Sequence, residues 1–266
     1  MPSFTTKRGL TWSYELAGQG EMLLFIHGFG VSKEIWAQQV KHFSSHYQVM
    51  TIDLPGHGHS SWMDVSLSDM AVDIKEILNT LDVHQINVVA SSFGGLIALK
   101  LFKFCPEKMQ RVVFVGALPK FAREDNYPAG LDIAKIRKLS NQFSGDYKAI
   151  LDIFFRSLFS KQDREGENFR WIKQCYSQQP VPQRPALLKF LDILEKEDLR
   201  DILAYIQYRV RLINGSEDYI CPGQLVEWLQ EALPYARFDL IKGAGHFSFL
   251  TRPKEFNDIL EGFLMA

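Results

Sequence analysis

Ser92 stands between a β-branched apolar run, residues 86–90, and an amphipathic run that starts with glycine, residues 94–99. The pattern predicts a strand, a sharp turn and a helix, with the small residues Ala90 and Gly94 where strand and helix approach each other. A serine at such a turn is lifted above the edge of a parallel sheet, beside the N–H of the next residue. Ser92 is therefore a candidate nucleophile, although a serine after a strand is also a common helix N-cap.

A serine nucleophile needs a base and a carboxylate that orients the base. His246 lies in a glycine-rich turn after the apolar run 236–241, and Asp218 follows the run 210–214, so each stands at the carboxyl end of a predicted strand. Alone, they could be a loop histidine and a turn-forming aspartate, but their joint occurrence favours catalysis. Glu217 is the competing acid; we favour Asp218 because Glu217 points the opposite way if the segment is extended.

The oxyanion that forms during acyl transfer needs backbone N–H donors. The N–H of Phe93, directly after the nucleophile, is one candidate. The apolar run 22–26 ends in His27-Gly28-Phe29-Gly30, where the N–H of Phe29 is the second candidate, although this segment could be a simple strand exit. The predicted reaction is two-step ester hydrolysis through a covalent serine intermediate, with no metal and no organic cofactor.

Hydrophobic runs predict strands near residues 11–17, 22–27, 47–53, 86–90, 111–117, 210–214 and 236–241, with helices between most of them. Continuous apolar strands indicate a mostly parallel sheet that is covered by helices on both faces. The alternation stops after residue 118, and segments 146–158 and 186–194 have the pattern of amphipathic helices. We therefore expect an α/β core, residues 1–118 and 204–266, and an inserted helical cap, residues 119–203, over the serine.

On these residues the chain resembles the α/β-hydrolase superfamily over nearly its whole length. Further marks are residues 53–60 (DLPGHGHS), after a strand, and Pro222. Within the superfamily it is similar to the esterases that demethylate pimeloyl-acyl-carrier-protein methyl ester in biotin synthesis. Residues 115–121 (VGALPKF) with Asp125 and Pro128, and residues 198–200 (DLR), carry this likeness. The resemblance implies an α/β-hydrolase fold, a Ser-His-Asp triad, and a carrier-bound methyl ester as substrate.

The predicted cap is rich in aromatic residues that could form a roof over an apolar acyl chain. These residues are Phe121, Tyr127, Phe143, Tyr147, Phe154, Phe155, Phe159, Phe169, Trp171, Tyr176 and Phe190. Most must form the core of the cap itself, so we expect roughly two to four to touch substrate. The substrate-binding candidates are Phe121, Phe143, Phe155, Trp171, and, beside the oxyanion loop and the nucleophile, His27 and Ser91.

The 266-residue chain has 30 Lys and Arg against 31 Asp and Glu, a net charge of −1, so we expect neither a nucleic acid nor a membrane as partner. Between residues 133 and 190, however, eleven basic residues face five acidic ones. A basic cap would attract an acidic acyl carrier protein, although solvated helix faces are an ordinary alternative.

The N-terminal segment, the length of the apolar runs and the cysteines indicate the location of the protein and the state of its thiols. Residues 1–8 lack the apolar core of a signal peptide and no apolar run is long enough to cross a bilayer, so we expect a cytoplasmic location. Cys105, Cys175 and Cys221 are odd in number and widely spaced, which argues against disulfides and a zinc site and favours buried thiols.

Because the same triad serves several reactions, alternative functions stay open at this point. They are a generic short-chain carboxylesterase, a thioesterase, a cofactor-free perhydrolase, a carbon–carbon bond hydrolase of ring-fission products, and a non-enzymatic ligand receptor on a hydrolase scaffold. Serine at position 92 argues against haloalkane dehalogenases and epoxide hydrolases, which place aspartate there.

Overall fold

The computed structural model describes residues 2–125, 127, 130–206 and 209–266; Pro128, one of the residues that carry the resemblance, lies outside this set. In the described part, one sheet has the strand order β1-β2-β4-β3-β5-β6-β7-β8. The strands are β1 (Ser3–Thr5), β2 (Thr11–Ala17), β3 (Met22–Ile26), β4 (Gln48–Ile52), β5 (Ile86–Ser91), β6 (Met109–Val115), β7 (Arg209–Gly215) and β8 (Arg237–Ile241). β2 pairs antiparallel with β1 and β4, and all pairings from β4 to β8 are parallel.

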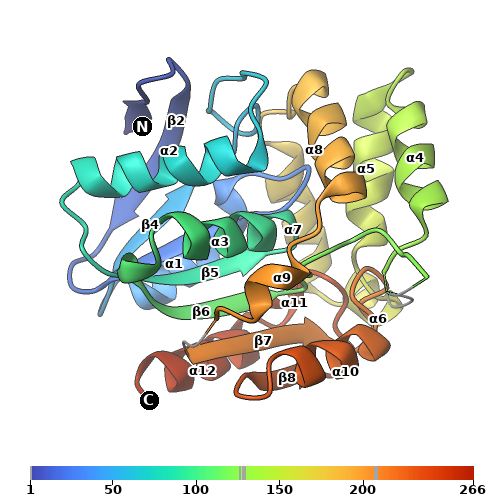
Figure 1. Cartoon of the computed structure of the whole chain (residues 1–266). Helices are drawn as coiled ribbons and strands as arrows, with labels where there is room; N and C mark the ends of the chain where they lie inside the picture. The colour runs from blue at the N-terminus through green and yellow to red at the C-terminus, as the bar shows by residue number, and fades with distance from the viewer. Residues whose placement is uncertain (1, 126, 128–129, 207–208) are drawn as a thin grey trace.

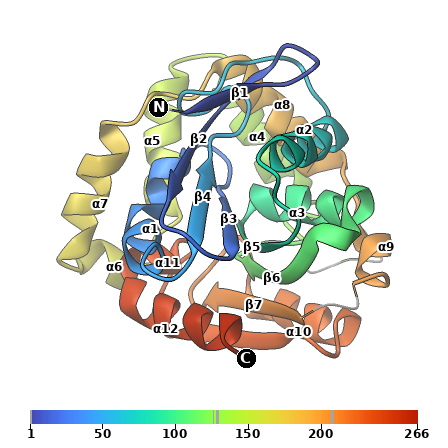
Figure 2. The same ribbon diagram turned by 90° about the vertical axis from the view of Figure 1, so that its left-hand side faces the viewer.

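Helices lie on both faces of this sheet and at one end of it. They are α1 (Ala37–Phe43), α2 (Leu67–Thr80), α3 (Phe93–Phe104), α4 (Ile133–Gln142), α5 (Tyr147–Ser157), α6 (Lys161–Glu165), α7 (Asn168–Ser177), α8 (Arg184–Lys196), α9 (Arg200–Leu203), α10 (Gly223–Ala232), α11 (Ser248–Thr251) and α12 (Pro253–Leu264), with 3₁₀ turns at Lys33–Trp36 and Pro106–Lys108. Figure 2 shows α1, α11 and α12 on one face and α2, α3, α9 and α10 on the other. This double cover explains why β3, β5 and most of β6 are buried along their length, and it confirms the predicted fold class.

All seven predicted strands are present, with ends that differ by no more than two residues. The fifth predicted strand, which is β6, begins at Met109 and ends at Val115, two residues earlier at each end than predicted. β1 was not predicted, because its three residues are partly or fully exposed and form no apolar run. It extends the antiparallel edge of the sheet, far from the carboxyl ends of the parallel strands where the predicted site lies.

The helices α4 to α8 lie between β6 and β7 in sequence, and they lie at the end of the sheet toward which β5 points (Figure 1). α9, by contrast, packs against α3 on the sheet. The two ends of the insertion meet: the N–H of Leu199 donates to the carbonyl of Pro119 at 2.9 Å, and the Lys120 ammonium pairs with Asp198 at 3.4 Å. We propose from this arrangement that residues 119–199 form a cap on the core. The expected cap, residues 119–203, therefore includes a short helix, α9, that packs with the core.

Within the described ranges, no helix has both the length and the apolar character that a membrane crossing requires. The three cysteines are free thiols, as predicted. Cys105 and Cys221 are buried, but the expectation of burial is wrong for Cys175, which is partly exposed on α7.

Candidate active site

Ser92 forms the tight turn between β5 and α3. Its backbone has φ 52° and ψ −119°, a conformation that residues other than glycine rarely adopt. Its N–H donates to the carbonyl of Val115 at 2.9 Å, and its side chain makes no N-cap hydrogen bond with α3, so the ordinary role of a cap does not apply. A Cβ at Gly94 would lie 2.7 Å from the carbonyl oxygen of Ile26, which explains the small residue there.

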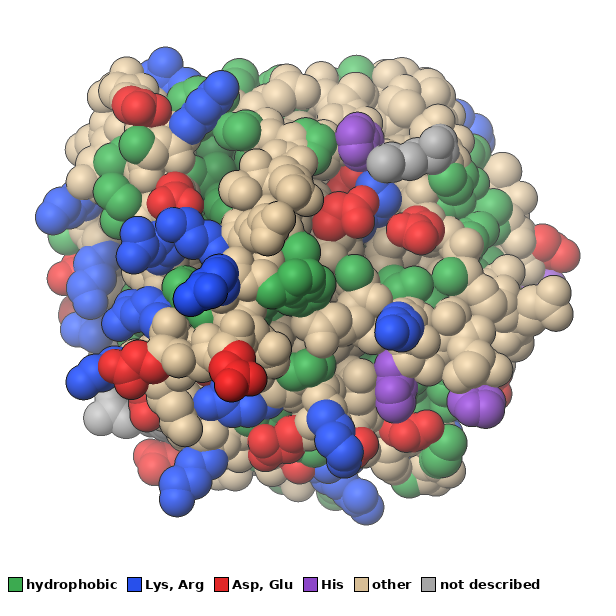
Figure 3. Space-filling model, turned by 180° about the vertical axis from the view of Figure 1, so that it is seen from behind, with side chains coloured by type: hydrophobic (Ala, Val, Ile, Leu, Met, Phe, Trp, Pro, Cys, Tyr) green, Lys and Arg blue, Asp and Glu red, His purple; other side chains and the backbone are tan. Residues whose placement is uncertain are grey.

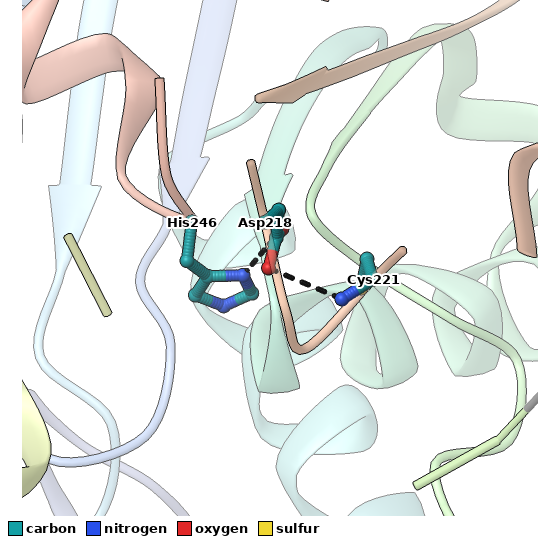
Figure 4. A group of neighbouring side chains, drawn as sticks. All are labelled: Asp218, Cys221 and His246. Carbon is teal, nitrogen blue, oxygen red and sulfur yellow. Dashed lines mark hydrogen bonds and ion pairs between the residues drawn. The ribbon is translucent and has the colours of Figure 1, made fainter. Parts of the chain in front are cut away.

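Asp218 and His246 form a buried hydrogen-bonded pair between two loops (Figure 4). The His246 Nδ1–H donates to Asp218 Oδ2 at 2.7 Å, and the other carboxylate oxygen accepts the N–H groups of Ile220 at 2.8 Å and Cys221 at 3.1 Å. This tautomer leaves Nε2 of the imidazole as the basic nitrogen. Glu217 is exposed, so the structure favours Asp218 as the orienting acid.

Gly116, directly after β6, has no side chain, and the His246–Asp218 pair lies where a side chain at this position would be. Its φ is +53°, and a Cβ added there would lie 2.9 Å from His246 Nδ1 and 3.1 Å from Asp218 Oδ2. The first of these contacts is shorter than real side chains make and the second is unusually tight, so a larger residue at position 116 would force the imidazole or the backbone to shift. The end of β6 therefore helps to set the position of the pair.

The donor atoms of Asp218, Cys221 and His246 lie within 4.8 Å of one another, a grouping that could hold a metal ion. The surroundings do not fit this use. Burial raises the pKa of the Cys221 thiol well above its usual range, so the thiolate that a metal needs is disfavoured. Both oxygens of Asp218 already accept hydrogen bonds, and a metal would displace His246 from one of them. The group fits an acid–base pair better than a metal site.

Ser92 and His246 line the same cavity, which has a volume of about 360 Å³ and lies beneath α4, α5 and α8. The remaining lining is mostly apolar. The cavity is lined by Phe29, Ser92, Phe121, Leu131, Lys135, Ile136, Lys138, Leu139, Gln142, Ile150, Ile153, Phe154, Ser157, Leu158, Leu191, Leu194, Tyr219, Ile220, His246 and Phe247. A small apolar chamber with a few polar groups is typical of sites for small organic ligands.

The aromatic candidates are distributed unevenly around this cavity. Phe121 lines it. Phe143 does not line it, but stacks on Phe29, which does, with ring centroids 6.2 Å apart. Phe155 is buried in the cap and stacks on Tyr176 at 3.6 Å. The structure therefore favours Phe121 as a substrate contact and gives Phe143 and Phe155 packing roles.

Trp171 lies outside the cavity, which corrects its selection as a substrate-binding residue. Its side chain is 47% exposed and lines a separate hollow of about 900 Å³ between α1 and α12. That larger hollow contains neither Ser92 nor His246. An amphipathic pattern in α7 does not show which neighbour its aromatic residue will meet, so the sequence could not exclude this position.

His27 and Ser91 are also placed differently from their predicted role, because both are fully buried and neither lines the cavity. His27 instead joins the loop after β3 to the loop after β4. Its Nε2 accepts the N–H of Leu54 at 2.9 Å, and its Nδ1 donates to the carbonyl of Gly28 at 2.8 Å. His57 makes the reverse connection, accepting the N–H of Gly30 at 3.3 Å.

These two imidazoles are neutral scaffolds for the predicted oxyanion loop. Burial is the main cause that lowers the pKa of His27 to about 4 and the pKa of His57 to about 3, from an ordinary value of 6.5. Protonation would place a hydrogen on each Nε2, where a backbone N–H now donates. The segment that includes Phe29 thus depends on both histidines staying uncharged.

We expect the stability of the protein to fall as the pH drops from about 6.5 to about 4. In this range the unfolded chain takes up protons on His27 and His57 that the folded state excludes, so acid favours unfolding. Urea denaturation at several pH values should show a slope on the order of 1 kcal/mol per pH unit for each histidine. The variants His27→Gln and His57→Gln should each have a shallower slope, and slopes equal to that of the wild type would contradict this assignment.

The predicted oxyanion donors flank the nucleophile. Phe93 begins α3, directly after Ser92, and its ring stacks on Phe190 of α8 with centroids 4.1 Å apart. The loop that holds Phe29 passes close to the nucleophile, because a Cβ at Gly28 would lie 3.7 Å from Ser92 Oγ. This placement supports the proposal that the N–H groups of Phe29 and Phe93 hold the oxyanion.

Tyr219 is a cavity residue that the sequence analysis did not select. Its hydroxyl is 2.8 Å from the hydroxyl of Ser157 on α5, and both residues line the cavity. The pair joins the loop of Asp218 to the cap. Its adjacency to Asp218 was the available signal, but only the packing of the cap shows that the ring faces the cavity.

Comparisons with known proteins agree with this geometry. A family model described as alpha/beta hydrolase fold matches residues 21–253. A pimeloyl-[acyl-carrier protein] methyl ester esterase from Nitrosomonas europaea is 29% identical over 91% of this chain and 95% of its own length. The esterase of the same name from Aeromonas hydrophila is 28% identical, over 95% of this chain and 98% of its own length.

Solved structures show the same fold. An esterase from Exiguobacterium antarcticum superposes with a TM-score of 0.91 over 99% of both chains at 22% identity. A bromoperoxidase from Bacillus anthracis has a TM-score of 0.88 and 28% identity, and the match covers 97% of this chain and 96% of the bromoperoxidase.

Proposed function

Because the chain belongs to the α/β-hydrolase fold family, we propose that it is a serine carboxylesterase that hydrolyses a methyl ester. The observation that carries the proposal is the buried hydrogen bond from His246 to Asp218, in a cavity that the strained elbow serine also lines. An imidazole whose Nδ1 is held by a carboxylate has its other nitrogen free to take a proton from a serine hydroxyl.

The proposed reaction has two steps. Ser92 Oγ attacks the ester carbonyl while His246 takes its proton, and the N–H groups of Phe29 and Phe93 stabilise the oxyanion. His246 then protonates the departing alcohol, and the acyl group stays on the serine. Water, deprotonated by the same imidazole, releases the acid and restores the enzyme.

Turnover of simple esters tests this function. We expect hydrolysis of p-nitrophenyl acetate, butyrate and octanoate, and release of methanol from a methyl ester of a medium-length acid, because the cavity is apolar and small. A single slow burst without turnover would indicate a ligand receptor. Rapid cleavage of a dienol-ketoacid without activity on esters would indicate a carbon–carbon bond hydrolase.

We further propose that the acyl group is carried by an acyl carrier protein, as in the pimeloyl-carrier esters named for the similar proteins. Ten of the eleven basic residues between 133 and 190 are exposed, whereas one of the five acids, Asp163, is buried. Figure 3 shows Lys and Arg side chains gathered at the left, the end of the molecule that the cap helices form. Charge of this kind attracts an acidic partner and the phosphate of its prosthetic arm.

Salt and charge reversal separate this proposal from a generic esterase. For a carrier-bound methyl ester, kcat/KM should fall as salt rises, because steering of a charged partner is screened over about 8 Å at physiological ionic strength. Replacing Arg156, Arg164 and Arg170 together with glutamate should give the same defect at low salt. Hydrolysis of p-nitrophenyl butyrate by this triple variant is the control and should be unchanged. Equal effects on both substrates, or none, would leave a short-chain carboxylesterase without a carrier partner.

A further inference from the structure

We propose that Asp163, on the cap helix α6, is a positioning residue that holds the loop of His246 in its reactive place. The inference rests on the proposed function, because it takes His246 as the catalytic base. Asp163 lies 83 positions before His246 in the sequence and belongs to the cap rather than to the sheet. Its carboxylate nevertheless accepts a hydrogen bond from the N–H of Gly245, the residue directly before His246.

The carboxylate of Asp163 is fully buried and accepts three separate donors. Oδ2 accepts the N–H of Gly245 at 2.7 Å and the N–H of Ser160 at 3.1 Å, and Oδ1 pairs with the Arg252 guanidinium at 3.2 Å. A buried carboxylate is costly unless it is fully hydrogen-bonded. Here the hydrogen-bonding partners tie together α6, the His246 loop, and the residue before α12.

Two more hydrogen bonds connect the same segments. The N–H of His246 itself donates to the carbonyl of Leu158 at 2.8 Å, and the Ser160 hydroxyl donates to the carbonyl of Gly243 at 2.7 Å. The segments are in close contact, because a Cβ at Gly245 would lie 2.6 Å from the carbonyl oxygen of Leu158. The cap therefore holds the backbone around His246 through hydrogen bonds, in addition to covering the cavity.

A second capping box in the chain shows that this arrangement exceeds what helix capping requires. Ser66 and Asp69 cap α2 with the same reciprocal hydrogen bonds that Ser160 and Asp163 make on α6, and Asp69 likewise pairs with an arginine, Arg8, at 3.0 Å. Asp69 is partly exposed and bonds no residue of the site. Contact with the His246 loop is the feature that only Asp163 adds.

Removal of the Asp163 carboxylate would leave the N–H of Gly245 and the Arg252 guanidinium without this acceptor, so the loop would shift to find others. A shift of about 1 Å in a reacting group costs on the order of 10²-fold in rate. Asp163 does not line the cavity, so binding of substrate should change little. The expected signature is a loss in kcat at nearly constant KM.

The test compares Asp163→Ala and Asp163→Asn with the wild type, using p-nitrophenyl acetate and the proton NMR signal of the hydrogen bond between His246 and Asp218. We expect kcat to fall by roughly 10- to 100-fold for Asp163→Ala, with KM within about threefold and the NMR signal shifted or broadened. Asp163→Asn keeps an oxygen that can accept from Gly245 and loses the ion pair with Arg252, so its loss in kcat should be smaller.

Asp69→Ala is the matched control, because it removes the same kind of capping acid and arginine pair from α2. It should lower thermal stability without changing kcat or the NMR signal. If Asp163→Ala does not fold, the smaller changes in Asp163→Asn decide the question. Wild-type kcat and an unchanged signal in folded Asp163 variants would overturn the inference. A wild-type protein that turns over no ester would contradict the proposed function instead, while the NMR comparison would still test the contact.

Discussion

Replacing Ser92 with alanine is expected to lower the esterase kcat by at least ~10³-fold while the protein stays folded. The reason is that the acyl intermediate forms on the Ser92 hydroxyl, so without it only the oxyanion donors and substrate binding remain. The measurement is steady-state hydrolysis of p-nitrophenyl butyrate, with circular dichroism to confirm the fold. His246→Ala should be similarly severe, because the hydroxyl would lose its base.

A covalent probe provides the control for this prediction. A fluorophosphonate, which reacts with activated serines, should label the wild type once per chain and should not label Ser92→Ala. If folded Ser92→Ala keeps more than a tenth of the wild-type activity, Ser92 is not the nucleophile. Labelling of the variant at another serine would identify the residue that performs the reaction instead.

Asp218→Asn is expected to lower kcat by about 10⁴-fold, because an amide cannot both hold the Nδ1–H tautomer of His246 and stabilise the charged imidazolium. The neighbouring change, Glu217→Gln, is the matched control: both replace a carboxylate with its amide in the same loop. Since Glu217 is exposed, its replacement should change kcat by less than about twofold.

The two variants should differ in binding as well as in rate. Asp218→Asn should leave KM nearly unchanged, because the carboxylate does not line the cavity. The opposite order of effects, with Glu217→Gln the more damaged variant, would transfer the role of the orienting acid to Glu217.

The elements that carry Ser92, Asp218 and His246 could be predicted because each follows a short apolar run. The runs before Ser92 and Asp218 are largely buried, whereas β8, before His246, is an edge strand in which only Ile241 is buried. An apolar run leaves a strong local signal, and chain order then brings the carboxyl ends of the strands to one edge. The contact between Asp218 and His246 follows from the adjacent strands β7 and β8. The need for a small residue at position 94, where strand and helix approach each other, could be predicted from the same pattern.

The cap could be predicted only in outline. Amphipathic patterns show that its helices exist, but they do not show which apolar face meets the cavity and which meets another helix. Phe121 and Trp171 look equivalent in the sequence, yet one lines the cavity and the other lies in a separate hollow. The roles of His27 and Asp163 were missed for a related reason, because both depend on backbone partners in distant segments.

The positive φ of Ser92 sets catalytic reactivity against the stability of the folded state at one position. A residue with a Cβ in this conformation costs on the order of 1–3 kcal/mol, which the neighbouring segments must offset. Glycine would adopt the same turn without that strain, so the most stable version of this elbow is one that cannot react. Strain at Ser92 therefore lowers the free energy of unfolding, and in return a hydroxyl is held at the cavity.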